Sequence, residues 1–322
     1  MKIGVVGAGH LGKIHIRLLK EIPEMELIGF YDSNVDAVAK ISADLGVKAF
    51  ADFAEMLALC DAVDVVSPTT THYEYAAAVI RANKHCFVEK PLSSTLAESE
   101  KLVSLAHEAG VTVQVGHVER FNPAFVAARP FIEKPMFIES HRLALFNPRG
   151  TDVPVVYDLM IHDIDIVLSV VKSNIRKVSA NAVAVVSDSA DIANARLEFD
   201  NGCVANLTAS RISMKNMRKI RFFQRDAYVS VDFYEKQAEV IRIRETEKQE
   251  GDGFIIDLGP EKGRKEIYFS MPEIPDSNAI KQELISFYEA IKNGTPAAVS
   301  VEDGCSAMQV AEKIMEKISF GG

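Results

Sequence analysis

The sequence contains no tryptophan, only four cysteines and no long hydrophobic run. The cysteines are scattered, so they offer neither the paired spacing of a zinc site nor a dense disulfide framework, and we predict no metal site. A membrane helix needs about 20 apolar residues in a row, and the longest candidates here, such as Ile164–Val171, are far shorter. The first residues, MKIGVVGAG, place glycines where a secretion signal has its apolar core. We therefore expect a cytoplasmic protein with no membrane partner.

Basic residues are in the minority, with 36 Lys and Arg against 45 Asp and Glu, which gives a net charge of −9. This balance argues against a protein that follows a phosphate backbone, so we expect no nucleic-acid partner. Hydrophobic residues make up 48% of the chain, enough to exclude general disorder. The length of 322 residues exceeds what one core usually fills, and this predicts two domains.

Residues 1–120 alternate between two hydrophobic periods. Short apolar runs, expected as strands, lie at Lys2–Val6, Glu26–Tyr31, Ala62–Ser67, His85–Val88 and Val111–Gly116. Amphipathic stretches, expected as helices, lie at Leu11–Lys20, Asn34–Leu45, His72–Asn83 and Thr95–Ala109. Such alternation is typical of a parallel sheet covered by helices on both faces. We predict an α/β chain whose residues 1–120 form a doubly wound Rossmann domain.

Residues 121–322 show a different pattern, which predicts an α+β domain with a mostly antiparallel, open sheet. Helices are expected at Tyr157–Val171, Ser277–Lys292 and Glu302–Ile318. Strands are expected at Val178–Val186, Ile192–Phe199, Cys203–Ser210, Lys219–Phe223, Ala227–Phe233 and Ala238–Ile243. Asn201-Gly202 suits a tight hairpin turn, so the two strands beside it should pair antiparallel. Because an antiparallel sheet with one uncovered face favours self-association, we expect a homodimer or homotetramer.

The first predicted strand is followed at once by a glycine motif, Gly7-Ala8-Gly9-His10-Leu11-Gly12, and then by a helix. Glycines in this context allow a tight turn, close approach of a pyrophosphate and close helix–strand packing. The next strand ends at Asp32, whose carboxylate can accept hydrogen bonds from the adenosine ribose. The alternative is that Asp32 or Ser33 caps the following helix. A carboxylate repels a 2′-phosphate and no Arg follows it, so NAD is favoured over NADP.

Four further segments resemble the Gfo/Idh/MocA family of sugar dehydrogenases in order and spacing. They are Ser67-Pro68-Thr69-Thr70-Thr71-His72, Glu89-Lys90-Pro91, Gly116-His117-Val118-Glu119-Arg120-Phe121-Asn122-Pro123 and Asp158-x-x-x-His162-x-x-Asp165. Together with the glycine motif they extend from Gly7 to Asp165. The third segment is particularly similar to the UDP-N-acetylglucosamine 3-dehydrogenases of that family.

The resemblance implies that the segment with Ser67, Thr69 and His72 lines the cofactor, although a threonine there also suits a helix cap. It places Glu89 beside the cofactor and makes Lys90 a hydrogen-bond donor to the nicotinamide ribose and to the substrate oxygen that is oxidised. A cis bond at Lys90–Pro91 would sharpen the aim of Lys90.

The resemblance also makes His162 the general base, with an imidazole suited to accepting an alcohol proton near neutral pH. Asp158 would orient it and contact substrate, and Asp165 is expected to be structural. If Tyr157–Val171 is one helix, these three side chains share a face. The alternative for His162 is a core histidine with satisfied hydrogen bonds.

Arg120 and Asn122 lie between the two predicted domains and are candidates for contact with substrate or nicotinamide. Arg211 begins a basic cluster that also contains Lys215, Arg218, Lys219, Arg221 and Arg225. The cluster suits the exposed face of a strand pair. Alternatively, Arg211 would bind the diphosphate of a nucleotide sugar.

These observations predict an NAD-dependent oxidoreductase that takes hydride from a ring hydroxyl of a sugar or nucleotide sugar, with a UDP-N-acetylglucosamine-type substrate first. A dehydrogenase of a free polyol such as myo-inositol is the second interpretation. A non-catalytic NAD-binding ligand sensor is the third, although a sensor has no chemical need for Lys90, Asp158 and His162 together.

Overall fold

The computed structural model describes residues 1–146, 153–187, 189–245, 254–257, 259 and 264–320. It divides into two compact units. Unit 1 contains Met1–Val118 and Ser277–Gln309, and unit 2 contains Glu119–Asp276 and Val310–Gly322. The division expected at residue 120 lies close to the first crossing. Assigning all of 121–322 to the second domain, however, differs from the structure, which places Ser277–Gln309 in unit 1.

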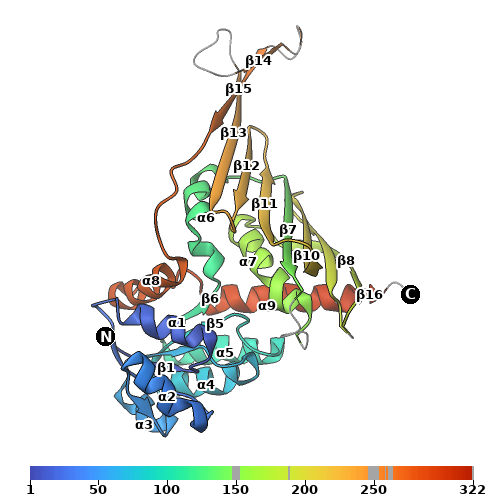
Figure 1. The fold of residues 1–322 in the computed structure, drawn as a ribbon. Coiled ribbons are helices and arrows are strands. Elements are labelled where there is room, and N and C mark those ends of the chain that lie inside the picture. The colour runs from blue at the N-terminus through green and yellow to red at the C-terminus, as the bar shows by residue number, and fades with distance from the viewer. Residues whose placement is uncertain (147–152, 188, 246–253, 258, 260–263, 321–322) are drawn as a thin grey trace. The chain divides into compact units, whose positions relative to one another are not determined.

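Unit 1 is built on a six-stranded sheet in the order β3-β2-β1-β4-β5-β6 (Figure 1). All of its strand pairs are parallel. The strands are β1 (Lys2–Val6), β2 (Glu26–Tyr31), β3 (Ala49–Phe50), β4 (Ala62–Val65), β5 (His85–Glu89) and β6 (Val113–Gly116). The order reverses between β1 and β4, and in open parallel sheets this switch point is where ligands bind. The predicted Rossmann sheet is confirmed.

Four helices of unit 1 follow strands where the sequence predicts them, whereas no helix was predicted at Phe53–Leu59. The helices of this unit are α1 (His10–Leu19), α2 (Val35–Leu45), α3 (Phe53–Leu59), α4 (Thr69–Arg81), α5 (Leu96–Ala109), α8 (Ala279–Asn293) and the first part of α9 (Val301–Lys317). Helix α5 begins at a capping box, in which Thr95 and Glu98 satisfy each other's backbone N–H groups. It ends at Gly110 in the left-handed conformation, with φ 63°.

Helix α8 belongs to unit 1 because its apolar face completes the unit's core. Leu284 and Phe287 are fully buried there, and the rings of Phe287 and Phe87 of β5 lie 5.9 Å apart. On the surface, Lys281 of α8 donates to Glu21, just after α1, over 3.0 Å. Sequence spacing predicted the helix but contains no signal for which sheet it covers.

Unit 2 contains a ten-stranded sheet in the order β14-β15-β13-β12-β11-β7-β10-β9-β8-β16. Among the described strands, β7 with β10 and β8 with β16 are parallel and the other pairs are antiparallel, as predicted. The strands are β7 (Phe137–Leu145), β8 (Ile175–Val183), β9 (Ile192–Phe199), β10 (Val204–Ser213), β11 (Met217–Phe223), β12 (Ala227–Asp232), β13 (Gln237–Glu245), β14 (Phe254–Asp257), β15 (Arg264–Ser270) and β16 (Ser319–Phe320). The expected hairpin joins β9 to β10, with Gly202 at φ 86°.

The helices of unit 2 pack on one face of this sheet. Helix α6 (Pro123–Ala128) lies on β12 and β13, and α7 (Ile161–Val170) lies on β7 and β10 (Figure 1). The single helix predicted at Tyr157–Val171 is a π-helical turn at Val156–Met160 followed by α7. Short 3-10 turns lie at Val118–Phe121 and Arg129–Phe131.

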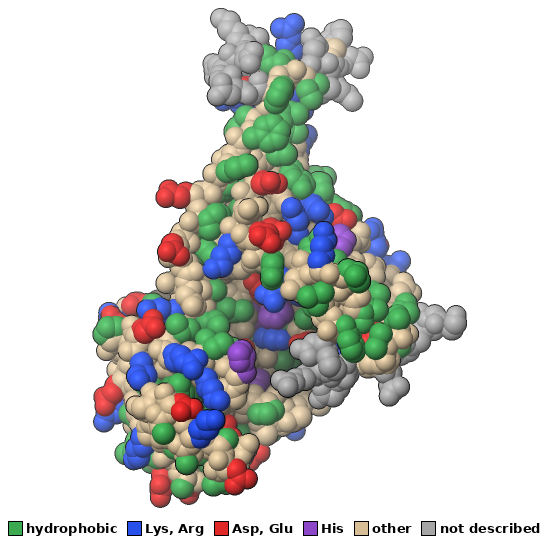
Figure 2. Space-filling view, viewed as in Figure 1, with side chains coloured by type: hydrophobic (Ala, Val, Ile, Leu, Met, Phe, Trp, Pro, Cys, Tyr) green, Lys and Arg blue, Asp and Glu red, His purple; other side chains and the backbone are tan. Residues whose placement is uncertain are grey.

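At one end of the sheet, β13, β15 and β14 carry apolar side chains into solvent (Figure 2). Phe254 and Phe269 stand edge to face there with ring centroids 6.3 Å apart. In the described part of the chain, every helix is too short or too polar to cross a bilayer.

Candidate active site

The three glycines of the motif after β1 have three different surroundings. Gly7 has φ +93°, and a Cβ there would lie 2.6 Å from the Ser67 backbone, so β1 and the segment after β4 approach too closely for a side chain. A Cβ on Gly12 would lie 2.0 Å from the Gly7 carbonyl oxygen. A Cβ on Gly9 would meet no described atom within 4 Å. The motif is therefore packed on two sides and open on the third, where a diphosphate can approach the start of α1.

Asp32, at the end of β2, holds this turn in place. Its Oδ2 accepts a hydrogen bond of 2.6 Å from the Ala8 N–H, and its Oδ1 accepts one of 2.8 Å from the Asn34 N–H. The N-cap of α2 is Asn34, so neither Asp32 nor Ser33 occupies the capping position. A carboxylate offers about four lone-pair sites, so Asp32 keeps acceptor capacity for ribose hydroxyls.

A cavity of about 560 Å³ opens over this turn at the carboxyl end of the sheet. It brings together most of the residues predicted to bind the cofactor, from four separate loops, whereas Ala8 and Gly12 do not line it. Its lining residues are Gly7, Gly9, His10, Leu11, Asp32, Ser33, Asn34, Val66, Ser67, Pro68, Thr69, His72, Glu89 and Lys90. The open Gly9, the start of α1 and the cavity together suit a dinucleotide.

His72 of α4 connects two of these loops. It is buried, and its ring nitrogens lie 2.8 Å from the carbonyl oxygens of Ser67 and of Pro91. Burial lowers the pKa of His72, which favours the neutral imidazole. Within the first of these loops, Thr71 donates a hydrogen bond of 2.8 Å to the Ser67 hydroxyl. His72 therefore borders the cavity mainly as the residue that ties the two loops together.

Lys90 stands where the buried end of strand β5 leaves the core. Phe87 and Val88 are inaccessible to solvent, whereas Lys90 is half-buried and lines the cavity. The Lys90 N–H donates to Glu89 Oε2 over 3.1 Å, and the Lys90–Pro91 bond is cis, as the sequence left open. An ammonium group on a half-buried turn at the rim of a ligand cavity is placed to act on a bound molecule.

In unit 2, Asp158 lies in the π-helical turn and His162 in the first turn of α7. Both are partly exposed, whereas most of the neighbouring side chains are buried. Asp165, three residues after His162, is 1% exposed, and Arg120 donates to it through Nε at 2.8 Å and Nη2 at 2.6 Å. Asp165 is structural, as predicted, because its carboxylate is held by this bidentate ion pair.

Sequence reasoning missed a second ion pair at the same place. Asp163 is buried and receives Arg142 Nε at 2.9 Å and Nη2 at 3.1 Å, while Nη1 of Arg142 donates to Glu119 at 2.9 Å. The two aspartates that follow His162 in α7 are thus each held by an arginine. Two acidic residues in a strongly apolar helix were the available signal, since buried carboxylates need partners.

The predicted substrate contacts Arg120, Asn122 and Arg211 are all engaged within unit 2. Asn122 caps α6 by accepting from the Ala124 N–H, and it donates to Glu119 and to the Phe233 carbonyl. Arg211 is 6% exposed and donates to two carbonyl oxygens, those of Val153 at 2.6 Å and Ala190 at 3.2 Å. Each has a structural role in the described residues, whatever else it contacts.

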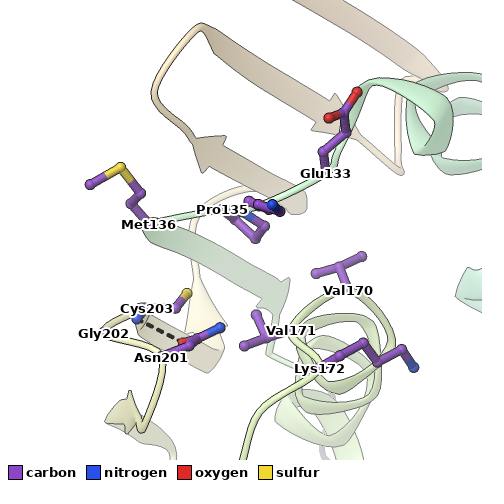
Figure 3. Close-up of a pocket in the computed structure, with 10 residues that line it drawn as sticks. Glu133, Pro135, Met136, Val170, Val171, Lys172, Asn201, Gly202 and Cys203 are labelled. Atoms are coloured by element: carbon purple, nitrogen blue, oxygen red, sulfur yellow. Dashed lines mark hydrogen bonds between the residues drawn. The ribbon is translucent and has the colours of Figure 1, made fainter.

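A second cavity of about 560 Å³ lies in unit 2 between the start of β7, the end of α7 and the β9–β10 hairpin (Figure 3). Asn201 Oδ1 accepts from the Cys203 N–H at its wall, and Pro135, Met136 and Val171 give it an apolar lining. None of the predicted site residues lines it, so we assign it no part in the chemistry.

Comparison with known proteins gives the following matches. Residues 1–117 match a model described as "Oxidoreductase family, NAD-binding Rossmann fold", and residues 147–321 match "Oxidoreductase family, C-terminal alpha/beta domain". A UDP-N-acetylglucosamine 3-dehydrogenase of Acidithiobacillus ferrooxidans is 39% identical over 234 residues, which are 72% of this chain and 74% of that protein. A myo-inositol 2-dehydrogenase of Thermotoga maritima is 29% identical over 98% of this chain and 97% of its own.

Solved structures show the same relationship. UDP-N-acetylglucosamine 3-dehydrogenase GnnA from Acidithiobacillus ferrooxidans superposes with a TM-score of 0.88 at 32% identity, covering 99% of this chain and 97% of its own. A levoglucosan dehydrogenase in complex with NADH and L-sorbose superposes with a TM-score of 0.84 over 98% of this chain and 96% of its own. At 17% identity it shows a shared fold.

Proposed function

The chain belongs to the Gfo/Idh/MocA oxidoreductase family, and we propose on that premise that it is an NAD-dependent dehydrogenase of a nucleotide sugar. The observation that carries this proposal is the cavity over the glycine motif, because one hollow is lined both by the open Gly9 and by Lys90. The proposed dinucleotide site and a charged hydrogen-bond donor therefore lie in the same cavity.

The residues around the cavity fit NAD better than NADP. Backbone N–H groups at the start of α1 and the bare Gly9 would hold the diphosphate. Asp32 would accept hydrogen bonds from the adenosine ribose, and its charge opposes a 2′-phosphate. Ser33 and Asn34, the next residues on the cavity wall, supply no positive charge. Ser67 and Thr69 would line the other side of the cofactor.

The nicotinamide supplies the hydride acceptor when it is bound. Lys90 donates a charged hydrogen bond to the substrate oxygen as negative charge develops on it, which is the contact that lowers the barrier most in a dry site. His162 removes the hydroxyl proton as a general base. Asp158, four residues earlier, orients the imidazole. The ion pairs of Asp163 and Asp165 keep α7, and with it His162, in a fixed register.

For the substrate we propose UDP-N-acetylglucosamine or a close nucleotide sugar, oxidised at a ring hydroxyl. Support comes from the 39% identical relative of that name and from the likeness at Gly116–Pro123. A free polyol is the second candidate, favoured by the relative named myo-inositol 2-dehydrogenase, which matches almost the whole chain. The chain has no tryptophan, so stacking on a sugar or uracil ring falls to phenylalanine or tyrosine.

Ligand-induced thermal stabilisation tests the proposal, since a ligand that binds only the folded state raises its melting temperature. We expect NAD to stabilise the protein and UDP-N-acetylglucosamine to add a further shift in its presence, while myo-inositol and free N-acetylglucosamine add none. Stabilisation by inositol alone would favour the polyol dehydrogenase. Stabilisation by a sugar without any reduction of NAD would favour a ligand sensor.

We further propose that the protein self-associates through the face of the unit 2 sheet opposite α6 and α7. Phe137, Phe223 and Tyr228 form an aromatic row on that face across three neighbouring strands, with ring centroids 5.8 Å and 5.1 Å apart. Phe223 is 38% exposed, although its neighbour Phe222 on the helix side is fully buried. Light scattering on the wild type and on Phe223→Lys tests this, with a shift towards monomer expected for the variant.

A further inference from the structure

A buried histidine, His15, lies in α1 and contacts two carboxylates from two different strands. It is inaccessible to solvent. Its Nδ1 lies 2.9 Å from Asp64 Oδ2 of β4, and its Nε2 lies 3.3 Å from Glu89 Oε1 of β5. Asp64 is also inaccessible, and Glu89 is 7% exposed. One imidazole therefore joins the helix that begins at the glycine motif to two neighbouring strands, β4 and β5, after which two of the loops that line the cavity follow.

The surroundings of this group are otherwise apolar, with one exception. The Phe87 ring stands edge-on to the imidazole with centroids 5.9 Å apart. Glu283 of α8 is fully buried, and an atom of its carboxylate, one of Glu89 and a ring nitrogen of His15 lie within 4.8 Å of one another. On β6, Gly116 makes room for Glu89, because a Cβ there would lie 2.9 Å from the carboxylate. The charged groups that face His15 are thus Asp64, Glu89 and Glu283.

Each ring nitrogen of His15 faces a carboxylate, although only the Nδ1–Asp64 contact has hydrogen-bond geometry, and the imidazolium form pairs its charge with both. A neutral imidazole has one N–H and donates to one carboxylate, whereas the imidazolium donates from both nitrogens. Burial by itself lowers the pKa of His15, but the charges and hydrogen bonds of Asp64 and Glu89 outweigh it, so the pKa is raised well above its usual range. A positive charge here also offsets the burial of two carboxylates.

The second carboxylate oxygen of Glu89 connects His15 to the candidate active site. Oε2 of Glu89 accepts the backbone N–H of Lys90 over 3.1 Å, while Oε1 faces His15. The carboxylate is therefore held from one side by α1 and holds the turn of Lys90 from the other. Rotation of Glu89 about its side-chain bonds would release the Lys90 backbone.

We propose that His15 is a positioning residue for Lys90, which it fixes through Glu89 while bracing Glu89 against Asp64. The helix that begins at the cofactor motif is thereby tied to the turn that carries the catalytic ammonium group. The part of the proposal that concerns catalysis rests on the proposed function. The charge state of His15 and the position of Lys90 do not, and they are measured separately.

The first test uses the wild-type protein and needs no activity. Long-range proton–nitrogen NMR correlation on protein with labelled histidine distinguishes an imidazolium from either neutral tautomer. We expect the His15 ring to remain an imidazolium at pH 7.5, and assign its signal by its loss in His15→Gln. A neutral tautomer at that pH would overturn the proposal. So would a stoichiometric metal ion in the purified protein, because a metal-bound nitrogen cannot donate to a carboxylate.

The second test compares His15→Gln with His85→Gln. His85 is a partly buried histidine at the opposite end of β5, where its Nδ1 accepts the Thr112 N–H over 3.0 Å. The rate at which trinitrobenzenesulfonate modifies Lys90, followed by peptide mass spectrometry, reports the position of Lys90 without turnover. We expect this rate to change in His15→Gln and to stay at the wild-type value in His85→Gln. Equal rates in all three proteins would overturn the proposal.

Turnover supplies the third readout. A displacement of about 1 Å in a reacting group costs on the order of 100-fold in rate. We expect kcat of folded His15→Gln to fall about 10- to 100-fold, with the NADH dissociation constant within a few-fold of wild type. If His15 had a purely structural role, the substitution would lower the melting temperature, and kcat would not fall while NADH binding stays near the wild-type value. An unchanged kcat in the folded variant would exclude His15 as a positioning residue.

Discussion

The carboxylate of Asp32 accepts a hydrogen bond of 2.6 Å from the backbone N–H of Ala8, and this bond closes the glycine motif over the end of β2. The residue predicted to choose between NAD and NADP therefore also shapes the diphosphate loop. Because Oδ1 and Oδ2 each serve one backbone N–H, an amide in place of the carboxylate retains only one acceptor oxygen.

This relationship predicts the effect of Asp32→Asn. A hydrogen bond to a charged group contributes about 1.5–3 kcal/mol, so the dissociation constant of NAD should rise about 10- to 100-fold. The affinity for NADP should fall less than the affinity for NAD, because the variant no longer repels the 2′-phosphate. Isothermal titration with both cofactors measures this, and exposed Asp36→Asn is the control for the same change of charge. An unchanged NAD-to-NADP ratio would remove Asp32 from cofactor choice.

Replacing Lys90 by alanine should separate catalysis from cofactor binding. Loss of a preorganised donor to a developing oxyanion costs about 100- to 1,000-fold in kcat, whereas the diphosphate contacts of NAD remain. Steady-state turnover and NADH fluorescence titration give the two quantities, with Lys101→Ala on the exposed side of α5 as control. Turnover of Lys90→Ala at the wild-type rate would show that the ammonium group takes no part in the reaction.

His162→Asn should remove the pH dependence of oxidation on its acidic side. A histidine acts as a base only when neutral, so wild-type kcat/KM should fall as the pH drops and the imidazole takes up a proton. The variant should be about 100- to 10,000-fold slower and flat over that range. His141→Asn, on β7 of the same unit, should keep the wild-type profile. A variant that retains the acidic limb would rule out His162 as the base.

Asp191 should stabilise unit 2 in a pH-dependent way. Its Oδ2 accepts the backbone N–H groups of residues 185–187 over 2.7–3.0 Å, and Ser187 also donates to its Oδ1. Although burial opposes ionisation, these hydrogen bonds hold the pKa of Asp191 well below its usual range. Because the folded pKa is depressed, the stabilisation is complete above the unfolded value of about 3.9 and is lost as the pH falls towards the folded one.

Asp191→Asn should therefore lower the free energy of unfolding by about 1–3 kcal/mol at pH 7. Urea unfolding at pH 7 and at pH 3 measures the difference, which should shrink at the lower pH because the carboxylate of the unfolded wild-type chain takes up a proton there. Asp200→Asn, an exposed carboxylate on the β9–β10 turn, should change little at either pH. A difference that stays constant between the two pH values would contradict the hydrogen-bond account.

Local patterns predicted much of the fold. Lys2–Val6, Glu26–Tyr31 and Ile192–Phe199 are strands with the expected bounds, because runs of apolar or alternating residues between turn signals determine a strand locally. Strand β7 was missed although it lies near the centre of its sheet. Its alternation includes Arg142, whose burial depends on Glu119 and Asp163 far along the chain. The two-residue strand β3 is too short to show a period.

In the candidate site, too, some features could be predicted from the sequence and others could not. The loops that line the cofactor cavity follow from strand order, since parallel strands bring their carboxyl ends to one edge. The roles of Arg120, Asn122 and Arg211 did not follow, because their partners lie elsewhere in the sequence. Asp165 is 45 residues from Arg120, and the Val153 carbonyl is 58 residues from Arg211. The sequence therefore contains no signal for these internal bonds, and contact of the three residues with substrate stays a prediction.

Transfer of the substrate's own hydrogen tests the central claim most directly. UDP-N-acetylglucosamine carrying deuterium at C3 of the sugar is incubated with NAD, and the reduced cofactor is analysed by mass spectrometry while absorbance at 340 nm is followed. The account predicts NADH that carries one deuterium atom for each sugar oxidised, formed more slowly than from the unlabelled substrate. Absence of any reduced cofactor with every nucleotide sugar and polyol tried, or reduced cofactor without deuterium, would contradict it.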